Sequence, residues 1–276
     1  MLPLPDALIW AALALAVLLC LARQRTPGLI LLGIALLGAL ALGRITPPAL
    51  LISLAGLLLA WQTPSLPPPW RPMALALVLL WAVALTLHLV PGFSNLKVLD
   101  QVRAGPASVP FNMYLNIDKP LIFFGLLLAW PALPGPGGPL RWRPLALLLL
   151  PLSALLITAW QLGALRPEVG LPHWWWLFAL NNLLFTCVAE EALFRGFLQQ
   201  AFARRTRVWL GILIASLLFG VAHLAGGPLL VLFATLAGAC YGLAFHLSGR
   251  LGVAILLHFL FNFAHLALFT YPLASR

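Results

Sequence analysis

The chain has 276 residues, of which 63% are hydrophobic and only 8% are charged. This composition excludes a soluble globular fold, because the polar residues are too few to cover a core of that size. The net charge of +10 comes from single basic residues and short clusters between apolar runs, so no continuous nucleic-acid-binding surface is predicted.

Ten apolar runs of near membrane-crossing length follow one another along the chain. A helix needs roughly 17–25 residues to cross a bilayer, and the backbone polar groups of a lipid-embedded segment must be paired within it. Each run is therefore predicted to be a helix. The runs lie at about 7–22, 28–43, 47–62, 73–90, 120–134, 144–164, 173–200, 209–225, 229–247 and 251–270. The second and third are short and form either two spans or a hairpin. The sequence predicts an all-α, polytopic transmembrane helix bundle of about 8–10 spans.

The basic residues between the runs predict how the bundle is oriented. With ten spans, nine of the 16 Lys and Arg residues fall in one set of connections and six fall in the other. The richer set contains the cluster ARRTR at 203–207 and is predicted to be cytoplasmic, which places both termini outside. We expect an integral, multi-pass protein of the plasma (inner) membrane.

The connection at 91–119 is the longest segment without an apolar run. Long connections in a compact chain are usually functional or interfacial. The loop is predicted to be an amphipathic cover or a contact site for substrate, and a plain surface connection is the alternative. We divide the chain into an N-terminal transmembrane region, 1–165, which includes this loop, and a C-terminal membrane core, 166–276.

Two of the six acidic residues lie side by side within an apolar run. A carboxylate at membrane depth costs roughly 2.5–3.5 kcal/mol on insertion scales, so Glu190 and Glu191 need an explanation. Glu191 and Arg195 are four residues apart and are predicted to form a supporting ion pair on one helix face. Glu190 is rotated by about 100° from Glu191 and has no cation on its own face, which suits a general base. Alternatively, Glu190 pairs with a buried His or Asn and only locks the bundle.

Two later runs carry imidazole and amide side chains at helical spacing. His223 follows Phe219 by four residues, and His258 precedes Asn262 by four residues. Each pair by itself is also compatible with hydrogen bonds between core helices. A buried acid, two imidazoles and an amide brought together from neighbouring helices can activate water and stabilise an oxyanion.

The run between these two histidine-bearing helices carries the pattern GACYG, from Gly238 to Gly242. Such GxxxG patterns allow two helices to approach closely. Glycine is also common in membrane helices, so the pattern has an equally plain interpretation.

The polar patterns resemble the motifs of the CPBP family, the CAAX-protease and bacteriocin-processing (Abi) group that includes type II CAAX prenyl endopeptidases. The motifs EExxxR, FxxxH and HxxxN are similar, in this order, to residues 190–195 (EEALFR), 219–223 (FGVAH) and 258–262 (HFLFN). The resemblance extends over about 173–268, little more than a third of the chain.

This resemblance implies an intramembrane endopeptidase that hydrolyses C-terminal or membrane-embedded peptides. Glu190 and His223 would activate a water that attacks a peptide carbonyl. His258 and Asn262 would hold the developing oxyanion, and the Glu191–Arg195 pair would support the site. The implied partners are a peptide or membrane-protein substrate and the lipid bilayer.

The resemblance leaves open whether a metal takes part, because family members have also been described as metalloproteases. Glu190, His223 and His258 are the possible zinc ligands, with one position open for water. The chain has no HExxH motif, in which two ligands and a base share one helix. We favour a metal-free glutamate mechanism without a cofactor.

Two functions of other classes are also considered. The same helices can serve a non-catalytic membrane scaffold or a bacteriocin-immunity protein. A transporter can use a buried acid to relay protons, but transporters favour inverted repeats with broken helices, and the sequence shows no internal repeat.

Overall fold

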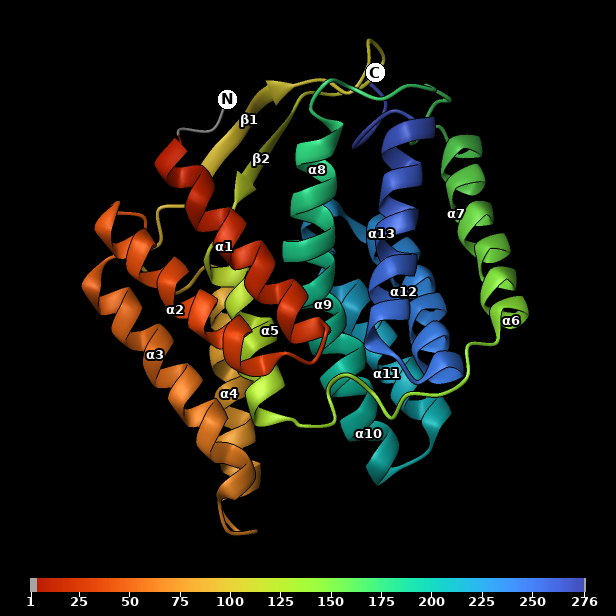
Figure 1. Cartoon of the computed structure of the whole chain (residues 1–276). Coiled ribbons are helices and arrows are strands. Elements are labelled where there is room, and N and C mark those ends of the chain that lie inside the picture. Colours follow the sequence, from red (N-terminus) through yellow and green to blue (C-terminus); the bar gives the residue numbers. More distant parts are fainter. Residues whose placement is uncertain (1–3, 276) are drawn as a thin grey trace. The chain divides into compact units, whose positions relative to one another are not determined.

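The computed structural model describes residues 4–275, which are mainly helical (Figure 1). Each of the ten predicted apolar runs contains at least one helix. The described residues form two compact units that alternate along the chain. The first comprises 4–99, 113–131 and 184–189, and the second comprises 100–112, 132–183 and 190–275. A division of the chain near residue 165 stays a prediction.

The first unit is built from five α-helices. They are α1 (Leu4–Leu21), α2 (Arg25–Ala41), α3 (Pro47–Gln62), α4 (Arg71–Thr86) and α5 (Asp118–Ala129), with a 3₁₀ turn η1 at Thr63–Ser65. Helices α1 and α2 form a tightly packed pair, and α5 packs against both α3 and α4. The indole of Trp81 on α4 lies against Gly56 and Gly125, which leave room for it on α3 and α5.

Two ion pairs hold the ends of these helices. Arg44 donates to both carboxylate oxygens of Asp6, at 2.7 and 2.8 Å. This hydrogen bonding raises the pKa of the Arg44 guanidinium, which lies in the connection between α2 and α3. His88, at the end of α4, pairs with the buried carboxylate of Asp118 at the start of α5. Spacing along a single helix does not predict this contact, because Asp118 lies 30 residues from His88.

The connection at 91–119 contains two strands, β1 (Leu96–Val102) and β2 (Phe111–Leu115), which form a two-stranded sheet. The predicted helical bundle is confirmed, and this small hairpin is an addition to it in a connection that was expected to be a loop. The tip of the hairpin is anchored by Glu168, whose carboxylate accepts hydrogen bonds from the Ala107 amide and the Ser108 hydroxyl at 2.8 and 2.6 Å.

The second unit contains the helices that carry the three motifs. They are α6 (Trp142–Leu147), α7 (Leu149–Gln161), α8 (Trp175–Asn181), α9 (Val188–Glu191), α10 (Gln200–Arg205), α11 (Val208–Val221), α12 (Pro228–Ser248) and α13 (Leu251–Leu268). A 3₁₀ turn, η4 (Leu224–Gly226), joins α11 to α12. Helix α12 ends at Gly249, whose left-handed conformation (φ 62°) is typical of a residue that terminates a helix.

Six of the described helices are long and apolar enough to cross a membrane. They are Leu4–Leu21, Pro47–Ser65, Trp142–Gln161, Trp175–Arg205, Pro228–Ser248 and Leu251–Leu268, and three shorter apolar helices are Arg25–Ala41, Arg71–Thr86 and Val208–Val221. The run predicted at 120–134 is only a 12-residue helix, α5, because Pro131 and Pro134 follow it. It spans about 18 Å at 1.5 Å per residue, well short of a hydrocarbon core of roughly 30 Å.

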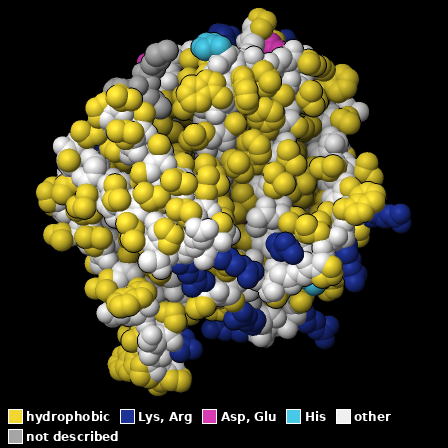
Figure 2. Space-filling model, viewed as in Figure 1, with side chains coloured by type: hydrophobic (Ala, Val, Ile, Leu, Met, Phe, Trp, Pro, Cys, Tyr) yellow, Lys and Arg dark blue, Asp and Glu magenta, His cyan; other side chains and the backbone are white. Residues whose placement is uncertain are grey.

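Large apolar side chains are exposed along these helices. Leu51, Trp61 and Leu150 are 67%, 64% and 67% exposed, and hydrophobic side chains cover most of the surface that Figure 2 shows. Soluble monomers rarely expose contiguous apolar patches larger than a few hundred Å². Together with the spanning helices, this surface identifies a polytopic integral membrane protein.

Candidate active site

The two adjacent glutamates lie in the middle of one long helix, Trp175–Arg205. Their own segment, α9, is a single α-helical turn between two π-helical segments, η2 (Asn182–Cys187) and η3 (Ala192–Gln199). π-Helical turns are rare and occur frequently at functional sites. A π-helical turn contains more residues than an α-helical turn. Residues of this long helix therefore cannot be assigned to helix faces by counting 3.6 residues per turn across its whole length.

Glu191 and Arg195 form the ion pair that their spacing predicts. Arg195 Nη1 donates to Glu191 Oε1 at 2.8 Å, and both side chains are completely buried. The guanidinium also donates through Nη2 to the carbonyl oxygen of Gly238 on α12, at 2.8 Å. It lies 4.5 Å from the ring centroid of Phe219, an attractive arrangement of cation and aromatic face.

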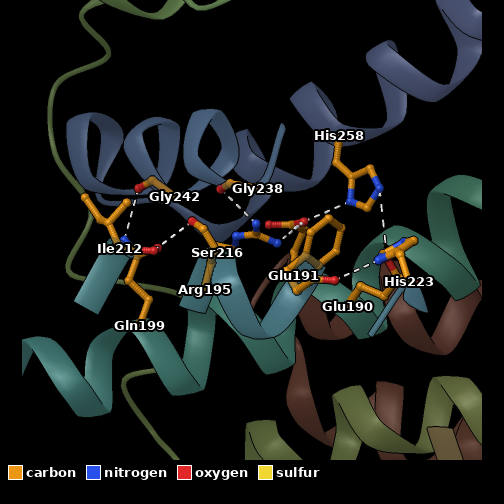
Figure 3. Close-up of polar contacts among 11 residues, drawn as sticks. Glu190, Glu191, Arg195, Gln199, Ile212, Ser216, His223, Gly238, Gly242 and His258 are labelled. Carbon is orange, nitrogen blue, oxygen red and sulfur yellow. Dashed lines mark hydrogen bonds and ion pairs between the residues drawn. The ribbon is translucent and has the colours of Figure 1, made fainter. Parts of the chain in front are cut away.

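His258 joins the two glutamates. Its Nδ1 lies 2.8 Å from Glu191 Oε1, and its Nε2 lies 4.0 Å from Glu190 Oε2. The ring is buried and stacks on Tyr241, with centroids 4.5 Å apart and planes 15° apart. A carboxylate beside one ring nitrogen fixes the orientation of an imidazole and the role of the other nitrogen. Glu191 therefore directs the Nε2 edge of His258 toward Glu190 (Figure 3).

His223 reaches the same cluster from the end of α11. Its Nδ1 is 2.8 Å from the carbonyl oxygen of Phe219, and a carbonyl only accepts, so Nδ1 carries the hydrogen. In the neutral ring, Nε2 is then free to accept a proton. The Phe219 ring contacts both imidazoles, with centroid distances of 4.6 Å to His223 and 5.6 Å to His258. Figure 3 shows Glu190 and the two histidines at one end of the cluster.

Burial differs sharply between the two glutamates. Glu191 is completely buried, whereas the Glu190 side chain is 27% exposed. His223 is half-buried as well. The cluster thus has a buried interior of Glu191, Arg195 and His258, and a partly exposed edge at Glu190 and His223.

Asn262 lies one helical turn beyond His258 on α13. Its side-chain amide donates to Asn182 Oδ1 at 3.2 Å, which ties α13 to the start of η2. Helical spacing does not predict this pairing, because the two asparagines are 80 residues apart in the sequence. The structure therefore brings Glu190, Glu191, Arg195, His223 and His258 together and attaches Asn262 to the same long helix.

The possible zinc ligands do not form a metal-ligand group as they stand. Among residues 4–275, no cluster of three or more His, Cys, Asp or Glu side chains has the arrangement of a metal site. The Nδ1 atoms of His223 and His258 are both engaged by oxygen acceptors, an arrangement that zinc-ligating histidines share, because such histidines bind the metal through Nε2.

Tyr241 and Gly238, both on α12, take part in the site although no motif contains them. Tyr241 supplies the ring that stacks on His258, and Gly238 supplies the carbonyl that Arg195 binds. The only sequence signal for either residue is the GxxxG pattern. It predicted close helix packing, but it did not predict that the Gly238 carbonyl oxygen accepts a hydrogen bond from Arg195.

Comparison with known proteins agrees with this geometry. Residues 172–264 match a family model described as type II CAAX prenyl endopeptidase Rce1-like. The matched segment is about a third of the chain and contains all three motifs. No curated protein and no solved structure matches the chain. The segment 172–264, with its acid pair and two converging histidines, is thus similar to the Rce1-like type II CAAX prenyl endopeptidases.

Proposed function

We propose that this membrane protein is an endopeptidase in which Glu190 activates the hydrolytic water. The observation that supports this most strongly is the contrast between the two adjacent glutamates. Glu191 is buried and doubly engaged, by Arg195 and His258, whereas Glu190 is partly exposed and approaches only the Nε2 of His258, at 4.0 Å. A carboxylate held at the accessible edge of a buried polar cluster has the placement that a general base needs.

In the proposed reaction, Glu190 takes a proton from water as the water oxygen bonds to the peptide carbonyl carbon. The carbonyl electron pair moves onto oxygen and gives a tetrahedral oxyanion. When the carbonyl re-forms, the C–N bond breaks, and Glu190 returns its proton to the leaving nitrogen. The products are a carboxyl group and an amine, so no further reactant is required. His223 Nε2 assists by accepting a hydrogen bond from the water.

His258 and Asn262 are the proposed oxyanion donors. With Nδ1–H directed at Glu191, the Nε2 of His258 donates only when the ring is protonated. Donors fixed in this way before the reaction are worth about 2.7–4 kcal/mol each in other hydrolases.

The matched family name points to prenylated proteins with a C-terminal CAAX sequence as the first substrates to test. A hydrophobic prenyl chain would stay in the bilayer beside the exposed apolar helix faces, which places the peptide near membrane depth. Membrane-embedded peptides without a prenyl group are the second class.

A substrate trap identifies the substrate and tests the proposal together. Cells that express Glu190→Gln are compared with wild type by membrane proteomics, with Asp100→Asn as a carboxylate-to-amide control on the exposed face of β1. We expect at least one uncleaved membrane protein to accumulate with Glu190→Gln only. Unchanged processing in that variant contradicts a catalytic Glu190 and favours a scaffold or immunity role.

The metal-free mechanism has its own test. We expect active, purified protein to contain less than about 0.1 zinc per chain by elemental analysis, because in the proposed mechanism Glu190 activates the water without a metal. Stoichiometric zinc, with activity that a chelator removes and zinc restores, would replace this mechanism by a metal-assisted one.

A further inference from the structure

Helix α12 carries none of the three motifs, yet its backbone is bonded to the site. The carbonyl oxygen of Gly238 accepts the Nη2 hydrogen of Arg195 at 2.8 Å. A Cβ atom at Gly238 would lie 2.8 Å from that same nitrogen and 3.1 Å from Cδ1 of Phe219. The missing side chain therefore leaves the space that the guanidinium occupies.

The same arrangement is repeated one turn further along both helices. The carbonyl oxygen of Gly242 accepts the Nε2 hydrogen of Gln199 at 3.0 Å. A Cβ atom at Gly242 would lie 2.8 Å from Gln199 Oε1 and 3.2 Å from Cγ2 of Ile212. Figure 3 shows the two glycines side by side on α12, each facing a side chain of η3. The two positions are thus closely matched in helix, partner type and crowding.

The two glycines differ in the further contacts of the side chains that bind them, Arg195 and Gln199. Arg195 donates to Glu191 at 2.8 Å, and the same Glu191 oxygen lies 2.8 Å from His258 Nδ1. A line of three short hydrogen bonds therefore runs from Gly238 to the imidazole. The contacts of Gln199 within residues 4–275 lead to Gly242 and to no catalytic side chain.

We propose that Gly238 is a positioning residue of the endopeptidase site, acting through Arg195 and Glu191 on His258. This inference rests on the proposed function. Arg195 is completely buried, so its guanidinium has no solvent-filled space into which it can retreat. A methyl group at position 238 must displace the guanidinium, and Glu191 and the His258 ring follow it. The second glycine, Gly242, has the packing role alone.

The test compares Gly238→Ala with Gly242→Ala in protein reconstituted into bilayers. Both variants lower the thermal unfolding midpoint by a similar amount, because the added methyl groups meet similar crowding. Gly238→Ala lowers kcat by roughly 10- to 100-fold with KM nearly unchanged, since displacement of a catalytic group by about 1 Å can cost on the order of 10²-fold. Gly242→Ala keeps kcat within about twofold of wild type, because it leaves that geometry in place. Equal kcat losses in both variants, or no loss in Gly238→Ala, overturn the inference.

A double-mutant cycle with Arg195→Lys shows whether the effect passes through Arg195. Lysine has a smaller head group, so the added methyl group displaces less in that background. We expect Gly238→Ala to reduce kcat much less in the Arg195→Lys protein than in wild type, because residues that act through one another are not additive. Additive losses overturn the inference. If the single Gly238→Ala protein folds poorly, Gly238→Ala is compared in the Arg195→Lys background alone, where a kcat loss as large as about 10-fold overturns the inference.

A measurement without substrate separates this inference from the proposed function. The ring ¹⁵N resonances of His258 are assigned by their loss in His258→Gln. We expect Gly238→Ala to shift the Nδ1 resonance and Gly242→Ala to leave it unchanged. If wild-type protein cleaves nothing but this shift occurs, the proposed function fails and the positioning contact stands. No shift in Gly238→Ala overturns the contact itself.

Discussion

At the scale of single residues, Glu191 makes more contacts than its spacing from Arg195 predicts. The predicted Glu191–Arg195 pair is confirmed, with both side chains buried. The spacing gave Glu191 a supporting role only, but Glu191 also accepts from His258. That second contact joins residues 67 positions apart, and no periodicity within one helix predicts it.

Substitutions of the pair test both roles of Glu191. Removing one partner of a buried pair leaves an uncompensated charge and costs about 3–5 kcal/mol, so Arg195→Leu is expected to lower stability. It is also expected to lower kcat, because Glu191 and His258 lose the guanidinium that positions them. Glu191→Gln is expected to lower stability and also kcat, because His258 loses its carboxylate partner. Thermal unfolding and cleavage rates measured on the same preparations check this. An Arg195→Leu protein with unchanged stability and no activity would contradict the assignment.

At the scale of elements, the sequence predicted the helices well and their internal geometry poorly. Every long apolar run contains a helix, because lipid leaves the backbone no other pairing. The π-helical segments on both sides of α9 were not predicted, since nothing in the residue pattern marks an extra residue per turn. The hairpin β1–β2 was also missed, because its tip is held by Glu168, about 60 residues away.

The hairpin supplies a prediction of its own. Glu168→Ala removes the carboxylate that accepts from Ala107 and Ser108. We expect faster hydrogen exchange at the Ala107 amide and faster proteolysis between residues 103 and 110. Arg166→Ala, an exposed change two residues earlier, serves as the control. Unaltered exchange at Ala107 in Glu168→Ala would show that other contacts hold the tip.

At the scale of the whole molecule, the exposed apolar helix faces identify a membrane protein, and the charges predict its orientation. The end of α10 and its connection to α11 carry three exposed arginines, Arg204, Arg205 and Arg207. Cytoplasmic connections of membrane proteins are enriched in Lys and Arg. That bias predicts this connection to be cytoplasmic, and the C-terminus, three apolar helices further along the chain, to be outside. The predicted outside position of the N-terminus requires in addition that the short helix α5 crosses the membrane.

Labelling of introduced cysteines tests the orientation. Val169, which is 82% exposed, and the exposed Thr206 lie in connections that the prediction places on opposite sides. The native cysteines, Cys20, Cys187 and Cys240, are buried and give little background. In intact cells, an impermeant maleimide is expected to label Val169→Cys, and to label Thr206→Cys only after permeabilisation. The reverse pattern would invert the topology.

A cleavage assay on the Glu190→Gln variant tests directly whether Glu190 activates the hydrolytic water. Purified wild-type and Glu190→Gln proteins are reconstituted into the same bilayers and incubated with prenylated CAAX peptides, and the released peptides are identified by mass spectrometry. We expect wild type to cleave the peptides, and Glu190→Gln to cleave them at a rate at least about 10³-fold lower, with an unchanged thermal unfolding midpoint. Cleavage by Glu190→Gln at the wild-type rate would contradict that role of Glu190.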